Sequence, residues 1–264
     1  MTERQLDLFA PEEPPETPAP VWRPPARPAP AELSDAELVA ALPGERLQES
    51  VALAAEAGRR RLASAVPALA LLCRRFVGWG SAAPVAQQVA ALAAMVEIGG
   101  APAAGAVATG IARAEFIGAT LVEAVSAAAA LDAALPEETL LGFLRQDDAK
   151  LREAACRCAR LTPEIVAGLI ELLDDLHPAV MREAACALGR LGRAEGRATL
   201  RRLLENEPSP AIVAALGRIA DEDCLVLLAR LARRVPALAD AVIDALEASE
   251  HPRAAALLES LQSL

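Results

Sequence analysis

Aromatic residues are nearly absent from this 264-residue chain, which holds four Phe, two Trp and no Tyr. Strands are built from aromatic and β-branched residues in alternating runs, so the composition disfavours a β-sandwich or a β-barrel. Hydrophobic residues still make up 54% of the sequence, enough to bury a core that must consist of Ala, Leu and Val. The composition therefore predicts an all-α protein.

Lysine is almost missing as well, since Lys150 is the single Lys among 26 basic residues. The 36 acidic residues leave a net charge of −10. Nucleic-acid-binding proteins hold the phosphate backbone with clustered cations, so the average charge argues against a general nucleic-acid binder. An average does not exclude a local cluster of Arg.

Uninterrupted apolar segments are also lacking. The Ala-rich run from Ala90 to Ala108 is broken by Glu97 and several Gly, and the first residues include acids, so neither a membrane helix nor a signal peptide is expected. The odd number of cysteines in a long, apolar chain fits reduced thiols better than disulfides. These features predict a soluble, cytoplasmic protein with no metal and no cofactor. The cysteines are Cys73, Cys156, Cys158, Cys186 and Cys224.

Proline is concentrated at one end of the chain. Nine of the 20 Pro lie between Pro11 and Pro30, without apolar periodicity, which predicts that residues 1–31 form a disordered, semi-rigid tail. The ordered domain is expected over residues 32–264. Ser34 and Glu37 have the spacing of a capping box, and a second helix is expected from residue 45 to residue 57, with Gly58 as its stop.

The remainder of the chain repeats with a period of about 30 residues. Arg152-Glu153-Ala154-Ala155-Cys156 recurs at 182–186, and Leu188-Gly189-Arg190-Leu191 recurs as Leu216-Gly217-Arg218-Ile219. Within one unit, apolar residues at i, i+4, i+8 and i+11 predict a helix that Gly192 ends, followed by a partner helix from Glu195 to Leu204. The period predicts an α-solenoid of stacked helical hairpins, with six or seven units between Glu45 and Leu261.

These repeats resemble the HEAT repeat superfamily, in particular the short, Ala-rich form named after phycobilisome lyases. The residues that carry the resemblance lie between 147 and 232: two acidic turns, two Arg-Glu-Ala-Ala helix starts and the closing Leu-Gly-Arg-Leu-Gly. The resemblance implies a ladder of stacked Asp–Arg pairs in which Asp175 would meet Arg182. Arg182 stands one residue closer to Leu188 than the family pattern has it.

A short motif stands in the predicted tail. It resembles the pentapeptide by which bacterial replication and repair proteins dock on the DNA sliding clamp, and its residues are Gln5, Leu6, Asp7, Leu8 and Phe9. Leu8 and Phe9 would fill an apolar pocket, Leu6 would pack beside it, and the Gln5 amide would bond at the rim. The alternative is that these residues are the apolar end of a tail, or that they fold back onto the first helix.

The repeats also contain a candidate basic surface, which stacking would align: Arg182, Arg190, Arg193, Arg197, Arg201 and Arg202. Bacterial alkylpurine DNA glycosylases use a HEAT-like fold, but their chemistry needs aromatic side chains and an acid beside the lesion. This chain has Phe76 and Trp79 near another Arg cluster and little else of that kind. They are expected to form an apolar knob at a helix end.

Other chemistry-bearing residues lack a site pattern. Cys156 and Cys158 lie two apart on a helix and point to different faces, and no His stands near them. His177 and His251 each precede a Pro at a helix start, without a nucleophile at motif spacing. Gly99-Gly100 follows no strand and precedes no phosphate-binding Lys. No catalytic residue is assigned.

The sequence thus predicts a non-catalytic, bacterial protein-binding scaffold or adaptor, recruited to the sliding clamp in replication or repair through its N-terminal peptide. A protein partner would lie in the solenoid groove. Three alternatives remain: a clamp-independent HEAT-repeat regulator, an accessory like the phycobilin lyase subunits, and a DNA-binding HEAT protein.

Overall fold

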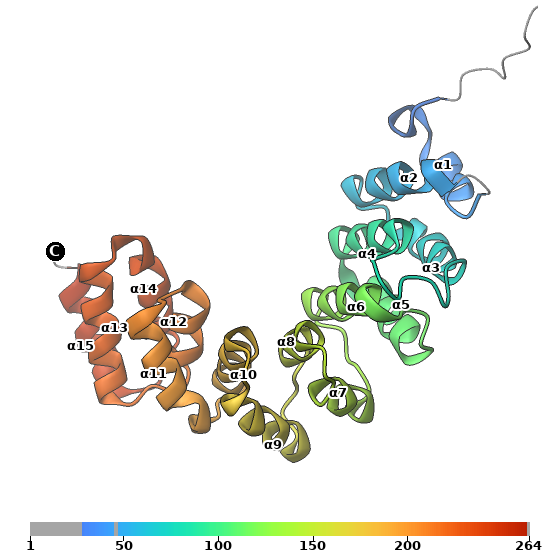
Figure 1. Ribbon diagram of the computed structural model, residues 1–264. Helices are drawn as coiled ribbons and strands as arrows, with labels where there is room; N and C mark the ends of the chain where they lie inside the picture. Colours follow the sequence, from blue (N-terminus) through green and yellow to red (C-terminus); the bar gives the residue numbers. More distant parts are fainter. Residues whose placement is uncertain (1–27, 45–46, 263–264) are drawn as a thin grey trace, which may run out of the picture.

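The computed structural model describes residues 28–44 and 47–262, and this part of the chain is helical throughout, without strands (Figure 1). The all-α prediction is confirmed. Five short 3-10 turns accompany the α-helices: Pro30–Glu32 (η1), Ala63–Ala65 (η2), Leu172–Asp174 (η3), Ala194–Gly196 (η4) and Pro236–Leu238 (η5). The α-helices are Asp35–Ala41 (α1), Leu47–Arg59 (α2), Val66–Arg74 (α3), Ala86–Ile98 (α4), Gly100–Ala112 (α5), Gly118–Ala130 (α6), Glu137–Leu144 (α7), Ala149–Arg157 (α8), Pro163–Glu171 (α9), Pro178–Arg190 (α10), Arg197–Asn206 (α11), Pro210–Gly217 (α12), Glu222–Arg234 (α13), Ala239–Glu247 (α14) and Pro252–Gln262 (α15).

Local sequence sets many of the helix starts. The first N–H groups of a helix lack intrahelical partners, and a side-chain oxygen before the helix accepts from them. Pro at the first helical position adds a preset φ at the start of α9, α10 and α12. The predicted Ser34–Glu37 capping box is present at α1. The other side-chain caps are Asp148 on α8, Thr162 on α9, Ser209 on α12 and Asp221 on α13.

The helices form two layers. The even-numbered helices α2 to α14 each pack on the next one and make up an inner layer, which the odd-numbered helices cover on the other side. Figure 1 shows the stack as an open arc, with α8 and α10 toward its concave side and α7 and α9 on its convex side. The seven inner helices agree with the six or seven units predicted from the period, and the solenoid architecture is confirmed.

Small residues bring the inner helices close together. A Cβ added at Gly189 of α10 would stand 2.6 Å from the carbonyl oxygen of Ala215 on α12. A Cβ at Gly217 would stand 2.7 Å from the Cβ of Ala245 on α14. Real Cβ atoms do not approach so closely, so only Gly fits at these contacts. The repeated Leu-Gly-Arg motif therefore marks the same helix contact in two successive units.

The buried apolar residues form two clusters that meet at α10. One cluster runs from Leu38 through the N-terminal repeats and ends with Ala184, Ala187 and Leu188. The other begins with Ala185 and Cys186 on the same helix and continues to Ala254. Two sets of residues on α10 therefore face two different neighbours.

Two predicted helix boundaries are wrong. Gly58 does not stop α2, which continues to Arg59, because Gly58 serves as a contact: its added Cβ would lie 2.9 Å from the Cα of Ala94 on α4. The chain turns at Arg61, with φ of +52°. The helix predicted to begin at Glu195 begins at Arg197, because residues 194–196 form a 3-10 turn. Gly192, at φ +70°, follows the end of α10 as predicted.

Candidate protein-binding surfaces

The middle of the inner layer carries paired charges on an accessible surface. Arg157 lies 3.7 Å from Glu153 on α8, and Arg190 lies 3.2 Å from Glu183 on α10. Arg190 also donates to the Cys156 carbonyl oxygen at 3.1 Å, so it bridges α10 to α8. All four side chains retain solvent contact. This part of the inner layer therefore presents a polar surface on which the positive and negative charges balance.

A buried ion pair joins α8 to the turn before α10. Arg152 donates to Asp175 through Nε at 2.8 Å and Nη2 at 3.1 Å, and the two side chains are only 12% and 7% exposed. The Asp175 carboxylate also accepts from the His177 backbone N–H at 2.8 Å. Burial acts to raise the pKa of Asp175, but these hydrogen bonds and the Arg152 charge lower it below its ordinary value. The pair therefore fixes the position of the turn before α10 relative to α8 of the preceding repeat.

The Asp–Arg pairing differs from the one that the resemblance implies. Asp175 meets Arg152 of the preceding repeat, and Arg182 instead lies 3.0 Å from Glu207. Arg152 stands on α8 in the position that Arg182 occupies on α10, one repeat later. Each of these Arg side chains therefore reaches forward to an acid of the following repeat. The Asp175–Arg182 pair that the resemblance implies is therefore replaced by Asp175–Arg152, in line with the one-residue departure of Arg182 from the family pattern.

The six Arg of the candidate basic surface are spread over two layers. Arg182 and Arg190 belong to inner helix α10, Arg193 to the turn after it, and the other three to outer helix α11. Four are paired with carboxylates: Arg182 with Glu207, Arg190 with Glu183, Arg193 with Glu195 and Arg197 with Asp221. Arg202 contacts the Met181 sulfur, and Arg201 is exposed. This pairing weakens the positive potential that a phosphate backbone would need.

Exposed apolar side chains gather on and beside α9. Leu161 is 64% exposed, Ile170 is 38% exposed, and Leu176 in the turn before α10 is 94% exposed. A groove of about 400 Å³ runs along α9, lined by Leu161, Thr162, Pro163, Val166, Ala167, Ile170 and Arg193. Among the described helices, α9 packs on α7 and α10 but not closely on α11. The outer layer thus opens at this point and leaves an apolar helix face in contact with water.

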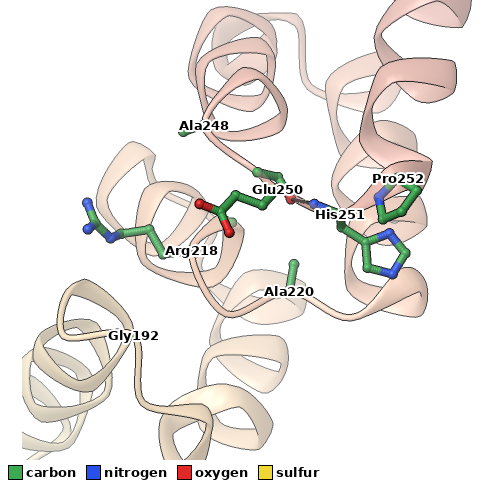
Figure 2. Close-up of a pocket in the computed structure, with 9 residues that line it drawn as sticks. Gly192, Arg218, Ala220, Ala248, Glu250, His251 and Pro252 are labelled. Atoms are coloured by element: carbon green, nitrogen blue, oxygen red, sulfur yellow. Dashed lines mark hydrogen bonds between the residues drawn. The ribbon is translucent and has the colours of Figure 1, made fainter.

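A second hollow, of about 620 Å³, lies where the ends of α10, α12 and α14 meet (Figure 2). Figure 2 shows the Arg218 side chain pointing away from the middle of this hollow. Glu250 lies closer to the middle, and the His251 ring lies on the side opposite Arg218. His251 uses Nδ1 to accept from the Arg253 backbone N–H at 3.1 Å. Ser249 lines the same hollow, and its Oγ accepts from the His251 backbone N–H at 3.3 Å instead of bonding to the imidazole, which differs from the Ser–His pairing of a hydrolase.

The cysteines occupy core positions. All five are buried free thiols, and burial raises the pKa of Cys73 and Cys156 to about 12. Cys156 and Cys186 stand at the same repeat position. In the described part of the chain, no three His, Cys, Asp or Glu residues gather closely enough to hold a metal ion. Such thiols serve as small apolar side chains.

The aromatic residues after α3 form one pair. Phe76 is buried, Trp79 is 66% exposed, and their rings meet edge to face with centroids 6.3 Å apart. This arrangement agrees with the apolar knob expected at a helix end. The clamp-like residues Gln5, Leu6, Asp7, Leu8 and Phe9 lie outside the described residues.

The groove on α9 was not predicted from the sequence, although two residues at its end have the spacing of a known helix-start motif. Leu161 and Val166 stand at the two positions of a hydrophobic staple around the Thr162 cap. A staple predicts a local contact but does not reveal whether a neighbouring helix will cover it. That depends on the spacing of α9 and α11, which the sequence pattern does not contain.

Comparison with known proteins supports the repeat fold. The family model described as HEAT repeats matches residues 135–214, which extend from α7 into α12. HEAT repeats generally mediate protein–protein interactions. No curated protein matches the chain significantly. Within the described ranges, no helix has the length and hydrophobicity needed to cross a bilayer.

Proposed function

We propose that this chain is a non-catalytic scaffold that binds a protein partner through its solenoid. The apolar groove on α9 carries the proposal, because contiguous exposed apolar surface in a protein usually marks an interaction site. The groove lies inside the segment that matches HEAT repeats, whose general role is protein binding. The paired charges of α8 and α10 supply a polar surface on the inner layer of the same repeats.

Introducing negative charges into the apolar groove on α9 tests the scaffold proposal. Leu161 and Ile170 are both solvent-exposed, so the doublet Leu161→Asp/Ile170→Asp should fold normally. The matched control is Ala237→Asp/Ala256→Asp, which places the same charges at exposed positions outside the grooves and hollows described above. Quantitative affinity purification from the source cell should give a partner that wild type and control retain and the α9 doublet loses. Equal recovery of every co-purifying protein by all three chains would refute the role of this groove.

We further propose that Gln5–Phe9 tethers the scaffold to a DNA sliding clamp. The support is the sequence: all five positions fit the clamp-binding pattern, and Phe9 is one of only four Phe in the chain. Burial of Leu8 and Phe9 would contribute about 1.5–3 kcal/mol each before the cost of ordering the peptide. The Pro-rich residues that follow would act as a semi-rigid spacer between the clamp and the solenoid.

Calorimetric titration against purified clamp tests the tether. Leu8→Ala/Phe9→Ala should weaken binding by roughly 100-fold or more, since each 1.4 kcal/mol is a factor of about ten. Glu12→Ala/Glu13→Ala changes the same tail without touching the motif and should bind as wild type does. Unchanged affinity of the Leu8/Phe9 variant would remove the clamp proposal and leave the scaffold proposal standing, because the α9 experiment does not involve the tail.

A further inference from the structure

An apolar groove also lies at the N-terminal end of the solenoid, where the described chain begins. It has a volume of about 470 Å³ and is lined by Pro28, Ala29, Pro30, Leu33, Ala41, Glu49, Ala52 and Leu53. One wall is the segment that leads into α1, and the other belongs to α1 and α2. Within the described part of the chain, no helical hairpin stacks on the N-terminal side of α1 and α2, so this apolar groove is not covered by a preceding unit.

Arg60 holds the entry segment in place, so the groove is preformed. Its guanidinium donates to the carbonyl oxygens of Leu33 at 2.8 Å and of Pro30 and Ala31 at 3.1 Å. It also pairs with Asp35 at 2.9 Å and with Glu56 at 2.6 Å. With its side chain 18% exposed, Arg60 thus ties residues 30–35 to the end of α2.

The chain itself supplies the nearest apolar side chains. Val21 and Trp22 stand just upstream of Pro28, separated from it by five residues that include Pro24 and Pro25. At about 3.1 Å per residue, this link reaches roughly 19 Å, enough for Trp22 to turn back along the wall that starts at Pro28. Because this link is short, it also keeps Trp22 at a high effective concentration near the groove.

The lining favours an apolar occupant. Apart from Glu49, the groove is lined by Pro, Ala and Leu, which suits the side chains of Val21 and Trp22. We propose that Val21 and Trp22 fold back into the groove between the entry segment and α2 and cap the N-terminal end of the solenoid. The proposal concerns this chain's own residues and does not depend on a clamp or on the groove of α9.

Tryptophan fluorescence of the full chain tests the cap. Trp22 and Trp79 are the only Trp, so Trp79→Phe leaves Trp22 as the single reporter. In the folded chain, Trp22 should emit at shorter wavelength than in a synthetic peptide of residues 1–27. Its acrylamide quenching constant should be several-fold lower than in that peptide. Identical emission and quenching in chain and peptide would overturn the proposal.

A substitution in the groove identifies the site. Ala52 is an exposed lining residue of α2, so Ala52→Lys in the Trp79→Phe background should block the groove and return Trp22 to the behaviour of the peptide. Ala55→Lys on the same helix is exposed but outside the lining and should leave Trp22 protected. Circular dichroism verifies that both variants are equally helical.

Two other occupants give different results. If Leu8 and Phe9 fill the groove, Trp22 stays as exposed as in the peptide, and the proposal is wrong. If a second copy of the chain supplies the Trp, protection disappears on dilution, which also overturns it. Protection that is independent of concentration, lost with Ala52→Lys and kept with Ala55→Lys is the result that supports the cap.

Discussion

The contact between Gly189 and Ala215 predicts that the smallest enlargement of a side chain will force two repeats apart. In Gly189→Ala the new Cβ would lie 2.6 Å from the Ala215 carbonyl oxygen and 2.8 Å from its Cβ. Carbon atoms pack best at about 3.5–4.0 Å, so α10 and α12 must separate by roughly 0.5–1 Å. Overpacking of this kind costs about 1–3 kcal/mol, and removal of a helical Gly returns about 0.5–1 kcal/mol. The net destabilisation expected is therefore between about 0 and 2.5 kcal/mol, centred near 1 kcal/mol.

Gly105 provides the matched control, since it lies within α5 with no neighbour inside 4 Å of its added Cβ. Gly105→Ala should gain about 0.5–1 kcal/mol from helix propensity alone. Thermal unfolding followed by circular dichroism should show opposite shifts, each about 2–4 °C per kcal/mol for a chain of this size. Equal stabilisation by Gly189→Ala and Gly105→Ala would refute the close contact.

Three further predictions concern charges and thiols. Arg152→Ala leaves the buried Asp175 carboxylate without its cation and should cost about 3 kcal/mol in urea unfolding. Arg193→Ala breaks an exposed pair and should cost at most about 1 kcal/mol, so equal losses would contradict the difference in burial. Arg59 and Arg60 lower the pKa of Glu56 from 4.5 to about 2, so its stabilisation is complete above pH 4.5 and is lost as the pH falls through 2. The melting temperature of Glu56→Gln should therefore decline less over that range than that of wild type; a parallel decline would argue against the assignment. The five buried thiols should not react with Ellman's reagent at pH 8 until the chain is unfolded by denaturant, and rapid reaction of the native chain would contradict their burial.

The repeat period predicted the architecture well because successive units make equivalent contacts with equivalent residues. Leu188 and Leu216 are both fully buried, and the glycines that follow them both meet an Ala of the next unit. The capping box at Ser34 was predictable for a similar reason, since all its partners lie within four residues. Contacts that are local in sequence, or that recur in successive repeats, can therefore be predicted from the sequence.

Contacts between units were less predictable. The sequence does not show whether Asp175 pairs within its own unit or with Arg152 of the unit before, because both spacings bring an Arg near it. Gly58 resembles a helix stop, and only the position of Ala94 shows that it is a packing site. Whether the Arg side chains of α10 and α11 are free or paired likewise depends on acids such as Glu207 and Asp221, which lie some 25 residues away.

Because the two hydrophobic cores meet at α10, a change in the packing of this helix would rotate the N-terminal half of the solenoid relative to the C-terminal half. The inner helices from α2 to α10 make four steps of about 8–10 Å, so the N-terminal arm extends roughly 35 Å from α10. A rotation of about 5° at that helix would move the far end by about 3 Å, the length of a hydrogen bond. Two partners bound at opposite ends of the arc would then move relative to each other. The buried side chains on the two faces of α10 would set the distance between them.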